Sequence, residues 1–194
     1  MNTDAIWRCV SDQRTEVADL LEGLDADQWM AQSLCDGWRV RDVAAHLTHS
    51  HMPRGRAVVE AVKSGFRFDP MIRRLAVEDR RSQAEIVAAL RAMVGARRKV
   101  PGTSVQQPLI ELLVHGQDIA VPLGIDLPMP TDAAVEAARR LAGMRFPVNA
   151  AKQLNGIRLV ASDADFAAGT GREISAPISD IVMVLAGRSD PGQA

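Results

Sequence analysis

Apolar side chains recur every three or four residues along much of the chain, the spacing that places them on one face of an α-helix. The first series follows the polar start Asn2–Asp4 and predicts a helix of about 20 residues. Its apolar members are Ile6, Val10, Val17, Leu20, Leu21 and Leu24. A second helix is expected to begin near Trp38, after a short link that contains Trp29. Pro53 and Gly55 are expected to kink it or end it.

A third helix is expected after a loop from Gly65 to Pro70, where glycine and proline disfavour regular structure. The later part of this helix begins with the pattern Ser82-x-x-Glu85, which is typical of a capping box at a helix start. Pro101 and Gly102 then break the helix, because proline cannot donate the backbone hydrogen bond that a helix requires.

A fourth helix is expected to open at Thr103 or Ser104 and to end before Gly124. Four amphipathic helices with moderate connections predict a mainly α protein, an antiparallel four-helix bundle over residues 1–125. The core of such a bundle can hold a metal ion between facing helices.

After the linker from Gly124 to Pro130, the pattern changes to short strands mixed with helices. The expected elements are a helix from Thr131 to about Met144, strands at residues 157–160 and 172–175, and a last helix from Pro177 to Gly187. We interpret residues 131–188 as a small α+β region too short to stand alone. Residues 189–194 are expected to be disordered.

The composition is that of a compact protein, because 194 residues with 47% hydrophobic side chains provide enough apolar surface for a core. The formal net charge of −1 gives no electrostatic footprint for nucleic acid or an anionic membrane. Neither a signal-peptide layout nor a membrane-spanning run is visible, so a cytoplasmic protein is expected. Cys9 and Cys35 are expected to be reduced thiols without a catalytic role. The oligomeric state is not readable from the sequence.

The fourth predicted helix carries ionisable side chains among apolar ones. At roughly 100° per residue, Glu111, His115 and Asp118 fall in one narrow stripe. The flanks and the back are covered by Leu109, Ile110, Leu112, Leu113, Val114, Ile119 and Val121. The helix is therefore expected to be buried nearly all round. Burying a polar group without a partner costs about 2–7 kcal/mol, so something must satisfy these groups.

A third candidate ligand is His46, which Val43 and Leu47 flank on the apolar half of the second predicted helix. With Glu111 and His115 it would supply two imidazoles and one carboxylate, the ligand count of a catalytic zinc site with an open position. The residues by themselves also allow a core ion pair or a hydrogen-bonded Glu–His pair without metal.

Three further residues lie near these candidates. Asp118, one turn beyond His115, can accept a hydrogen bond from a ligand imidazole and fix its tautomer, or it can be a simple buried polar contact. His49 is about 60° from His46 around the helix and is not expected to be a ligand. His51 lies farther round and is expected to face solvent.

Three segments carry a family resemblance: DGWRVRDVAAHL, then ELLVHGQDIAVPLG, then GREISAPISDIVMVLAGR. In this order they resemble the DinB-like metal-binding helical bundles, specifically the actinobacterial mycothiol-dependent maleylpyruvate isomerase family. The resemblance implies a divalent metal, usually zinc, held by His46, Glu111 and His115. An N/O ligand set leaves nickel and related ions open. The resemblance also suggests that Arg188 orients a carboxylate of substrate or cofactor; the alternative is an arginine that meets the helix dipole.

The sequence departs from the family pattern at the start of the second helix. The family usually has Ser or Thr where Arg39 stands, so the expected hydroxyl cap is missing. Asp42 in the first turn is expected to compensate through the helix dipole.

The resemblance implies mycothiol as the co-substrate. A zinc-like ion lowers the pKa of a bound thiol and holds it as thiolate near neutral pH. The expected function is therefore a metal-dependent enzyme whose thiol attacks an electrophilic substrate, as an isomerase or an S-transferase. The expected partners are that thiol and the substrate, with no nucleic acid and no membrane. A metal-dependent hydrolase and a metal-binding or sensing protein without turnover stay open as alternatives.

Overall fold

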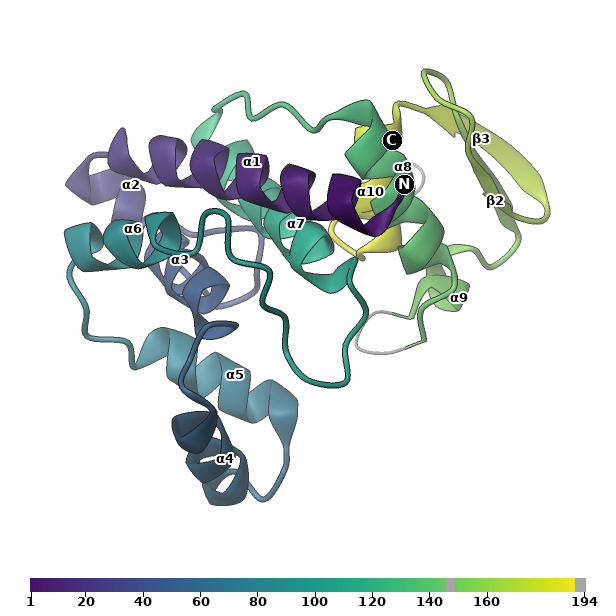
Figure 1. Ribbon diagram of the computed structural model, residues 1–194. Coiled ribbons are helices and arrows are strands. Elements are labelled where there is room, and N and C mark those ends of the chain that lie inside the picture. The colour runs from purple at the N-terminus through teal and green to yellow at the C-terminus, as the bar shows by residue number, and fades with distance from the viewer. Residues whose placement is uncertain (146–148, 191–194) are drawn as a thin grey trace. The chain divides into compact units, whose positions relative to one another are not determined.

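The computed structural model describes residues 1–145 and 149–190 (Figure 1). The chain divides into two compact units. Val10–Leu127 forms the first, called the bundle unit below, and Met1–Cys9 with Pro128–Ala194 forms the second, called the C-terminal unit. The division falls inside the predicted linker. Of the tail predicted to be disordered, residues 191–194 lie outside the described residues.

Helices dominate the bundle unit, as the hydrophobic pattern predicts. They are α1 (Thr3–Glu22), whose first residues belong to the C-terminal unit, α2 (Ala26–Met30), α3 (Val40–His49), α4 (Arg54–Lys63), α5 (Phe68–Val77), α6 (Gln83–Arg91) and α7 (Gln107–Ala120). A short 3₁₀ helix, η1 (Val121–Leu123), continues α7. No helix in the described part of the chain is both long and apolar enough to cross a membrane.

The core of the bundle unit includes α7, most of whose residues are buried. Helix α3 packs against α7, α6 and α5. A glycine allows close packing on α7: a Cβ atom at Gly116 would lie 2.9 Å from Leu127 Cδ2 and 3.4 Å from Val17 Cγ2. Because real Cβ atoms do not approach other carbons at 2.9 Å, only glycine fits here without a shift of its neighbours.

Two helix starts are capped by carboxylates. Glu85 Oε2 accepts a hydrogen bond from the Ser82 backbone N–H at 2.7 Å, and Ser82 Oγ accepts one from the Glu85 N–H at 3.3 Å. The predicted capping box is therefore confirmed. At the start of α3, Asp42 Oδ2 accepts the Arg39 backbone N–H at 2.9 Å. Asp42 thus satisfies the backbone N–H of the N-cap residue itself, a different donor from the first-turn N–H that a hydroxyl at position 39 would cap.

The prediction of a single third helix is wrong. Residues 68–77 and 83–91 form separate helices, α5 and α6, with a turn between them. Asp79 Oδ1 accepts the backbone N–H of Arg81 at 3.0 Å, a hydrogen bond two residues along the chain that offers the backbone an alternative to the helical one.

Two predicted boundaries also move. Phe68, Asp69 and Pro70 lie in the first turn of α5 instead of in a loop. Proline is tolerated there because the first N–H groups of a helix have no intrahelical partner. Helix α7 begins at Gln107, later than the predicted start at Thr103 or Ser104.

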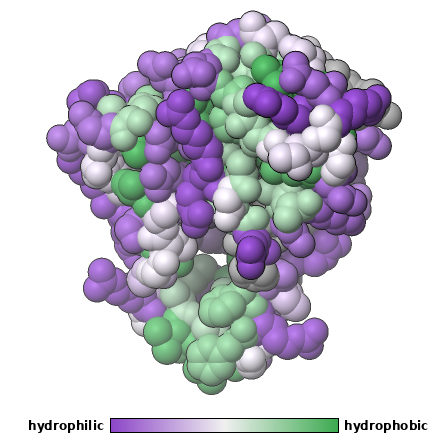
Figure 2. Space-filling model, turned by 90° about the vertical axis from the view of Figure 1, so that its right-hand side faces the viewer, coloured by the Kyte–Doolittle hydropathy of each residue, from purple (hydrophilic) through white to green (hydrophobic). Residues whose placement is uncertain are grey.

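The α4–α5 hairpin exposes a group of apolar side chains. Helix α4 packs on α5, and α5 packs on α3. The exposed members are Val58, Val59, Val62, Phe66 and Phe68. Figure 2 shows this surface as a green area at the foot of the molecule, with hydrophilic side chains on both sides.

The C-terminal unit combines helices with a small sheet. Its elements are α8 (Thr131–Ala142), α9 (Ala150–Gln153), β1 (Ile157–Ala161), β2 (Ala167–Gly169), β3 (Arg172–Ala176) and α10 (Ile178–Leu185). The sheet has the order β2-β1-β3, and β1 is antiparallel to β2 and parallel to β3. Helix α10 packs on α8 and contacts β1. The sequence predicted both β1 and β3 but missed β2.

The close packing at Gly116 predicts a stability difference between two glycines. Replacing Gly116 by Val should lower the free energy of unfolding by about 1–3 kcal/mol, because the added methyl groups overpack the contact with Leu127 and Val17. The matched control is Gly55→Val in α4, where a Cβ atom meets nothing within 4 Å and where no loss is expected. Urea unfolding followed by circular dichroism measures both. Equal midpoints for the two variants would contradict the close packing.

Candidate functional site

Two imidazoles meet where α3 packs against α7. The rings of His46 and His115 have centroids 5.0 Å apart, and their planes stand at 88° to each other. The Trp38 ring lies 5.2 Å from the His46 ring, also edge-on. Both imidazoles are half-buried. Two of the three predicted ligands, distant in the sequence, are therefore neighbours in the fold.

The His115 ring is held by a fully buried carboxylate. Asp118 is 0% exposed, and its Oδ2 atom is 2.8 Å from His115 Nδ1. An ionised carboxylate can only accept a hydrogen bond, so Nδ1 carries the proton. The lone pair of the neutral ring is then on Nε2. The contact suits the predicted role of Asp118 as the partner that fixes a tautomer, and that role stays a proposal.

Glu111 lies one helical turn before His115 on α7. Burial raises the pKa of its carboxyl above the usual range. The His115 charge opposes this shift most strongly, and a hydrogen bond from Gln107 Nε2 at 3.2 Å also opposes it, as does the Arg14 charge. A carboxylate in this environment is stabilised by a cation placed beside it.

Cys35 lies against the same buried carboxylate. Its Sγ atom is 3.0 Å from Asp118 Oδ2 and 3.8 Å from His115 Nδ1. The three candidate ligand atoms of Cys35, His115 and Asp118 all lie within 4.8 Å of one another. Sequence reasoning gave Cys35 no role, because no spacing pattern links this loop residue to a helix far along the chain.

Among the described residues, the structure brings the candidate ligand atoms of Cys35, His115 and Asp118 together. Of the predicted set, it places His46 beside His115, and Glu111 lies one helical turn before His115 on α7. The two sets exclude each other chemically, because a Nδ1 atom that donates its proton to Asp118 has no lone pair for a metal. Two imidazoles and a buried carboxylate fit a zinc-like ion. The assignment of His46, Glu111 and His115 as ligands stays a proposal.

His49, at the end of α3, and His51, just after it, have different surroundings. His49 makes an edge contact with His46, with ring centroids 6.3 Å apart, and its Nε2 atom lies 3.2 Å from Asp79 Oδ2. His51 was predicted to face solvent. It is instead partly buried, with a buried Nε2 atom, and burial is the main cause that lowers its pKa to about 4.

Arg188 belongs to the C-terminal unit, directly after α10. Its backbone N–H donates to the Met183 carbonyl at 2.9 Å, and its Nη1 atom donates to the Ala186 carbonyl at 3.2 Å. Both bonds satisfy carbonyl groups at the helix end, which matches the interpretation as a helix C-terminal arginine. A contribution of Arg188 to substrate binding stays a proposal.

Residues 10–101 match the family model of the mycothiol maleylpyruvate isomerase N-terminal domain. The crystal structure of the mycothiol-dependent maleylpyruvate isomerase is similar to the chain at a TM-score of 0.56 and 14% identity, over 97% of this chain and 90% of that one. A histidine-to-alanine mutant of that isomerase gives the same TM-score and coverage at 13% identity. No curated protein matches the chain by sequence.

At these identities the solved structures show the fold. The predicted fold class, a mainly α DinB-like bundle with a small C-terminal α+β region, is confirmed. The matched segment contains Trp38 and His46 and ends before α7 begins. The family model thus matches most of the bundle unit, residues 10–101, and the fold is similar to that of the mycothiol-dependent maleylpyruvate isomerase over almost the whole chain.

Proposed function

We propose that the protein is a divalent-metal-dependent enzyme that uses a low-molecular-weight thiol, mycothiol, to attack an electrophilic substrate. The names of the family and of its structural neighbours support mycothiol and an isomerase or S-transferase reaction. The observation that carries the proposal is the edge-to-face pair of His46 and His115 at 5.0 Å, with Glu111 one helical turn from His115.

The residues of the bundle unit have separate tasks in this proposal. His46, Glu111 and His115 would hold the ion through two imidazole nitrogens and one carboxylate, which leaves a coordination position open. Asp118 keeps His115 in the tautomer whose Nε2 atom carries the lone pair. Zinc is the metal we propose first, and nickel or a related ion also fits this set. When bound, such an ion supplies the charge that keeps a thiol ionised near neutral pH.

The nucleophile is proposed to come from the co-substrate. Cys35 Sγ donates to Asp118 at 3.0 Å, so this thiol of the chain is already engaged in a hydrogen bond with a buried carboxylate. Arg188 is proposed to orient an anionic group of the substrate through its guanidinium. A cytoplasmic location and the absence of nucleic acid and membrane partners stay predictions.

A second candidate function is metal binding without turnover through Cys35, His115 and Asp118. The observation that favours it is that these three ligand atoms lie within 4.8 Å of one another. A metal ion there would take the place of the two protons, on Cys35 Sγ and on His115 Nδ1, whose hydrogen bonds Asp118 accepts. We prefer the set of His46, Glu111 and His115. Asp118 and His115 already form a hydrogen bond at 2.8 Å, which metal binding at His115 Nδ1 would break.

The two donor sets predict different metal contents for single variants. Protein purified without a histidine tag should hold one divalent ion per chain, measured by elemental analysis. His46→Ala and Glu111→Gln should each lose most of it, because each removes one of three protein ligands. Asp118→Asn should weaken metal binding by roughly 10–100-fold, because it only disturbs the orientation of His115.

Cys35→Ser is the matched variant for the other set, and it should keep stoichiometric metal. His115→Ala removes a ligand from both sets and should lose the metal in either case. The proposal is wrong if Cys35→Ser and Asp118→Asn lose the metal while His46→Ala and Glu111→Gln retain it.

The thiol part of the proposal predicts a spectroscopic change. Titration of mycothiol into the cobalt-substituted protein should produce a sulfur-to-cobalt charge-transfer band, because the open position would accept the thiolate. The experiment uses Cys35→Ser protein, so that no sulfur of the chain near His115 can give the band. A spectrum that stays unchanged at saturating mycothiol, with cobalt still bound, would exclude the thiol mechanism.

A further inference from the structure

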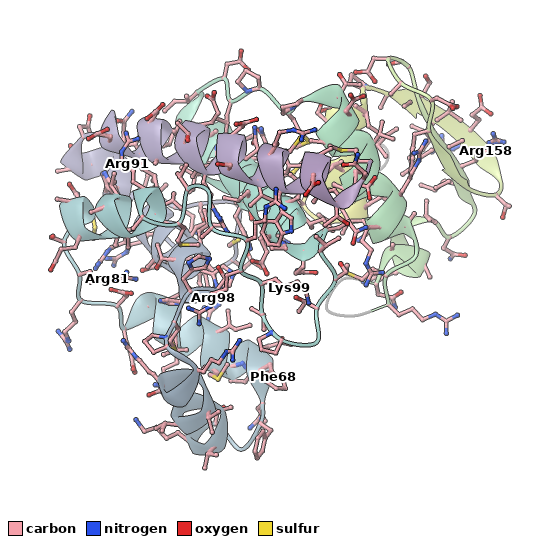
Figure 3. All side chains as sticks on the ribbon, viewed as in Figure 1. Phe68, Arg81, Arg91, Arg98, Lys99 and Arg158 are labelled. Carbon is pink, nitrogen blue, oxygen red and sulfur yellow. The ribbon has the colours of Figure 1, made fainter. Side chains whose placement is uncertain are left out.

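The α4–α5 hairpin carries apolar side chains on its outer side. At roughly 100° per residue, Val58, Val59 and Val62 of α4 fall within an arc of about 100° around the helix. Phe66, in the loop after α4, and Phe68, which Figure 3 labels where α5 begins, extend this surface. These five residues, called the hairpin face below, are each 51–66% exposed (Figure 2).

Another side of α4 is polar and faces inward. Glu60 is buried and accepts hydrogen bonds from Lys63 at 3.0 Å and from Arg74 of α5 at 2.6 Å. Together with Arg56, these side chains line a polar cavity between α3, α4, α5 and α6. A surface helix normally packs its apolar stripe on the core and turns its charged residues to water. Helix α4 reverses this order, so its apolar stripe gains little from burial within the described chain.

The loop after α4 holds Phe66 in a strained conformation. The Phe66 N–H donates to the Ala61 carbonyl at 2.8 Å, and the Gly65 N–H donates to the Val62 carbonyl at 3.0 Å, which is a Schellman motif. The motif needs a left-handed residue at Gly65, but Phe66 is left-handed as well, with φ of 59°. Such a conformation costs a bulky residue about 1–3 kcal/mol. Because Phe66 is mostly exposed, contacts within the chain offset little of this cost.

The area of the hairpin face suits an interface between two proteins. Its five side chains offer roughly 500 Å² of apolar surface per chain, judged from their exposed fractions and the usual sizes of valine and phenylalanine. Two such faces packed together bury roughly 1,000 Å², about the minimum for a specific interface before the surrounding polar residues are counted.

The form of the face favours a second copy of this chain as the partner. Two packed helices that expose a shared apolar side are half of a four-helix bundle, and a second hairpin completes it. Valine loses little side-chain freedom on packing, because its branched Cβ already restricts χ1. A two-fold dimer, the commonest assembly of soluble proteins, also matches an apolar face with itself.

We propose that the hairpin face is the interface of a homodimer, in which the α4–α5 hairpins of two copies pack on each other about a two-fold axis. The proposal is independent of the proposed metal and thiol, because His46, Glu111 and His115 all lie outside the hairpin.

The charges beside the face predict how salt acts on the dimer. Arg54, Lys63 and Arg67 of the same hairpin are exposed. In the dimer, like charges of the two copies lie at the rim, where they repel weakly and where salt screens them. The dimer should therefore tighten as the salt concentration rises. A dimer that weakens instead is held by charges and not by the apolar face, and it would overturn the inference.

The main test measures the mass of the full-length protein in solution. Sedimentation equilibrium of the wild type over a wide concentration range should show a reversible change from the mass of one chain to that of two. Val62→Glu should raise the dissociation constant at least tenfold, because the dimer would bury an unpaired charge. Phe66→Gly removes the ring and also the backbone strain, so it should keep the fold and dimerise more weakly.

The matched control is Val121→Glu, which makes the same change at an exposed valine of η1, outside the hairpin, and should leave the dimer unchanged. Circular dichroism checks that every variant is folded. A wild type with the mass of one chain at all concentrations would contradict the proposal. A dimer that Val62→Glu and Phe66→Gly leave intact would contradict it equally, because its interface would lie elsewhere.

A second arm of the test addresses an anionic lipid surface, which also suits apolar residues flanked by cations. Vesicles of phosphatidylglycerol and phosphatidylcholine are mixed with the wild type and with Val62→Glu. If the wild type stays monomeric and binds the vesicles, and if Val62→Glu or added salt weakens that binding, the face meets lipid and the inference fails. A dimer that does not sediment with the vesicles supports the inference.

Discussion

The fully buried carboxylate of Asp118 is the constraint on which the arrangement of the site depends. Its side chain accepts hydrogen bonds from His115 and from Cys35, and its backbone carbonyl accepts the Leu34 N–H at 3.0 Å. The loop before α3 is thus tied to α7 by both the side chain and the main chain of one residue. That loop leads into Trp38, whose ring contacts His46. A charge buried this deeply is tolerated only because its oxygens are satisfied.

A similar arrangement recurs at the other end of α3. There Asp79 accepts from His49 and from Arg81, and Arg81 also donates to Thr48 Oγ1 at 2.7 Å. In both places a carboxylate holds one nitrogen of an imidazole, but Asp118 lies on the same helix as His115, whereas Asp79 lies in the loop after α5. The two carboxylates differ in their second hydrogen-bond donor, which is the Arg81 guanidinium for Asp79 and the Cys35 thiol for Asp118. Helix α3 therefore connects two differently charged environments through the contact between His46 and His49.

The α4–α5 hairpin explains why the second environment is polar. Glu60 of α4 accepts from Lys63 of the same helix and from Arg74 of α5, and the ion pair with Arg74 joins the two helices. The apolar residues of the hairpin, such as Val58 and Phe68, are exposed instead. The charged side chains of the hairpin, Glu60, Lys63 and Arg74, line the polar cavity between α3, α4, α5 and α6.

The sequence by itself determined the helical fold, the capping box at Ser82 and the inward position of His46 and His115, because these follow from periodicity and short-range hydrogen bonds. The predicted end of the third helix at Pro101 and Gly102 was wrong, because α6 already ends at Arg91. Tertiary structure alone decided that Cys35 lies against Asp118, because a thiol in a loop carries no periodic signal. It also decided that His51 is partly buried. These two outcomes depend on which distant side chains meet, which spacing along the chain does not encode. The turn at Asp79 and Arg81 is a local hydrogen bond that the pattern of apolar residues does not reveal.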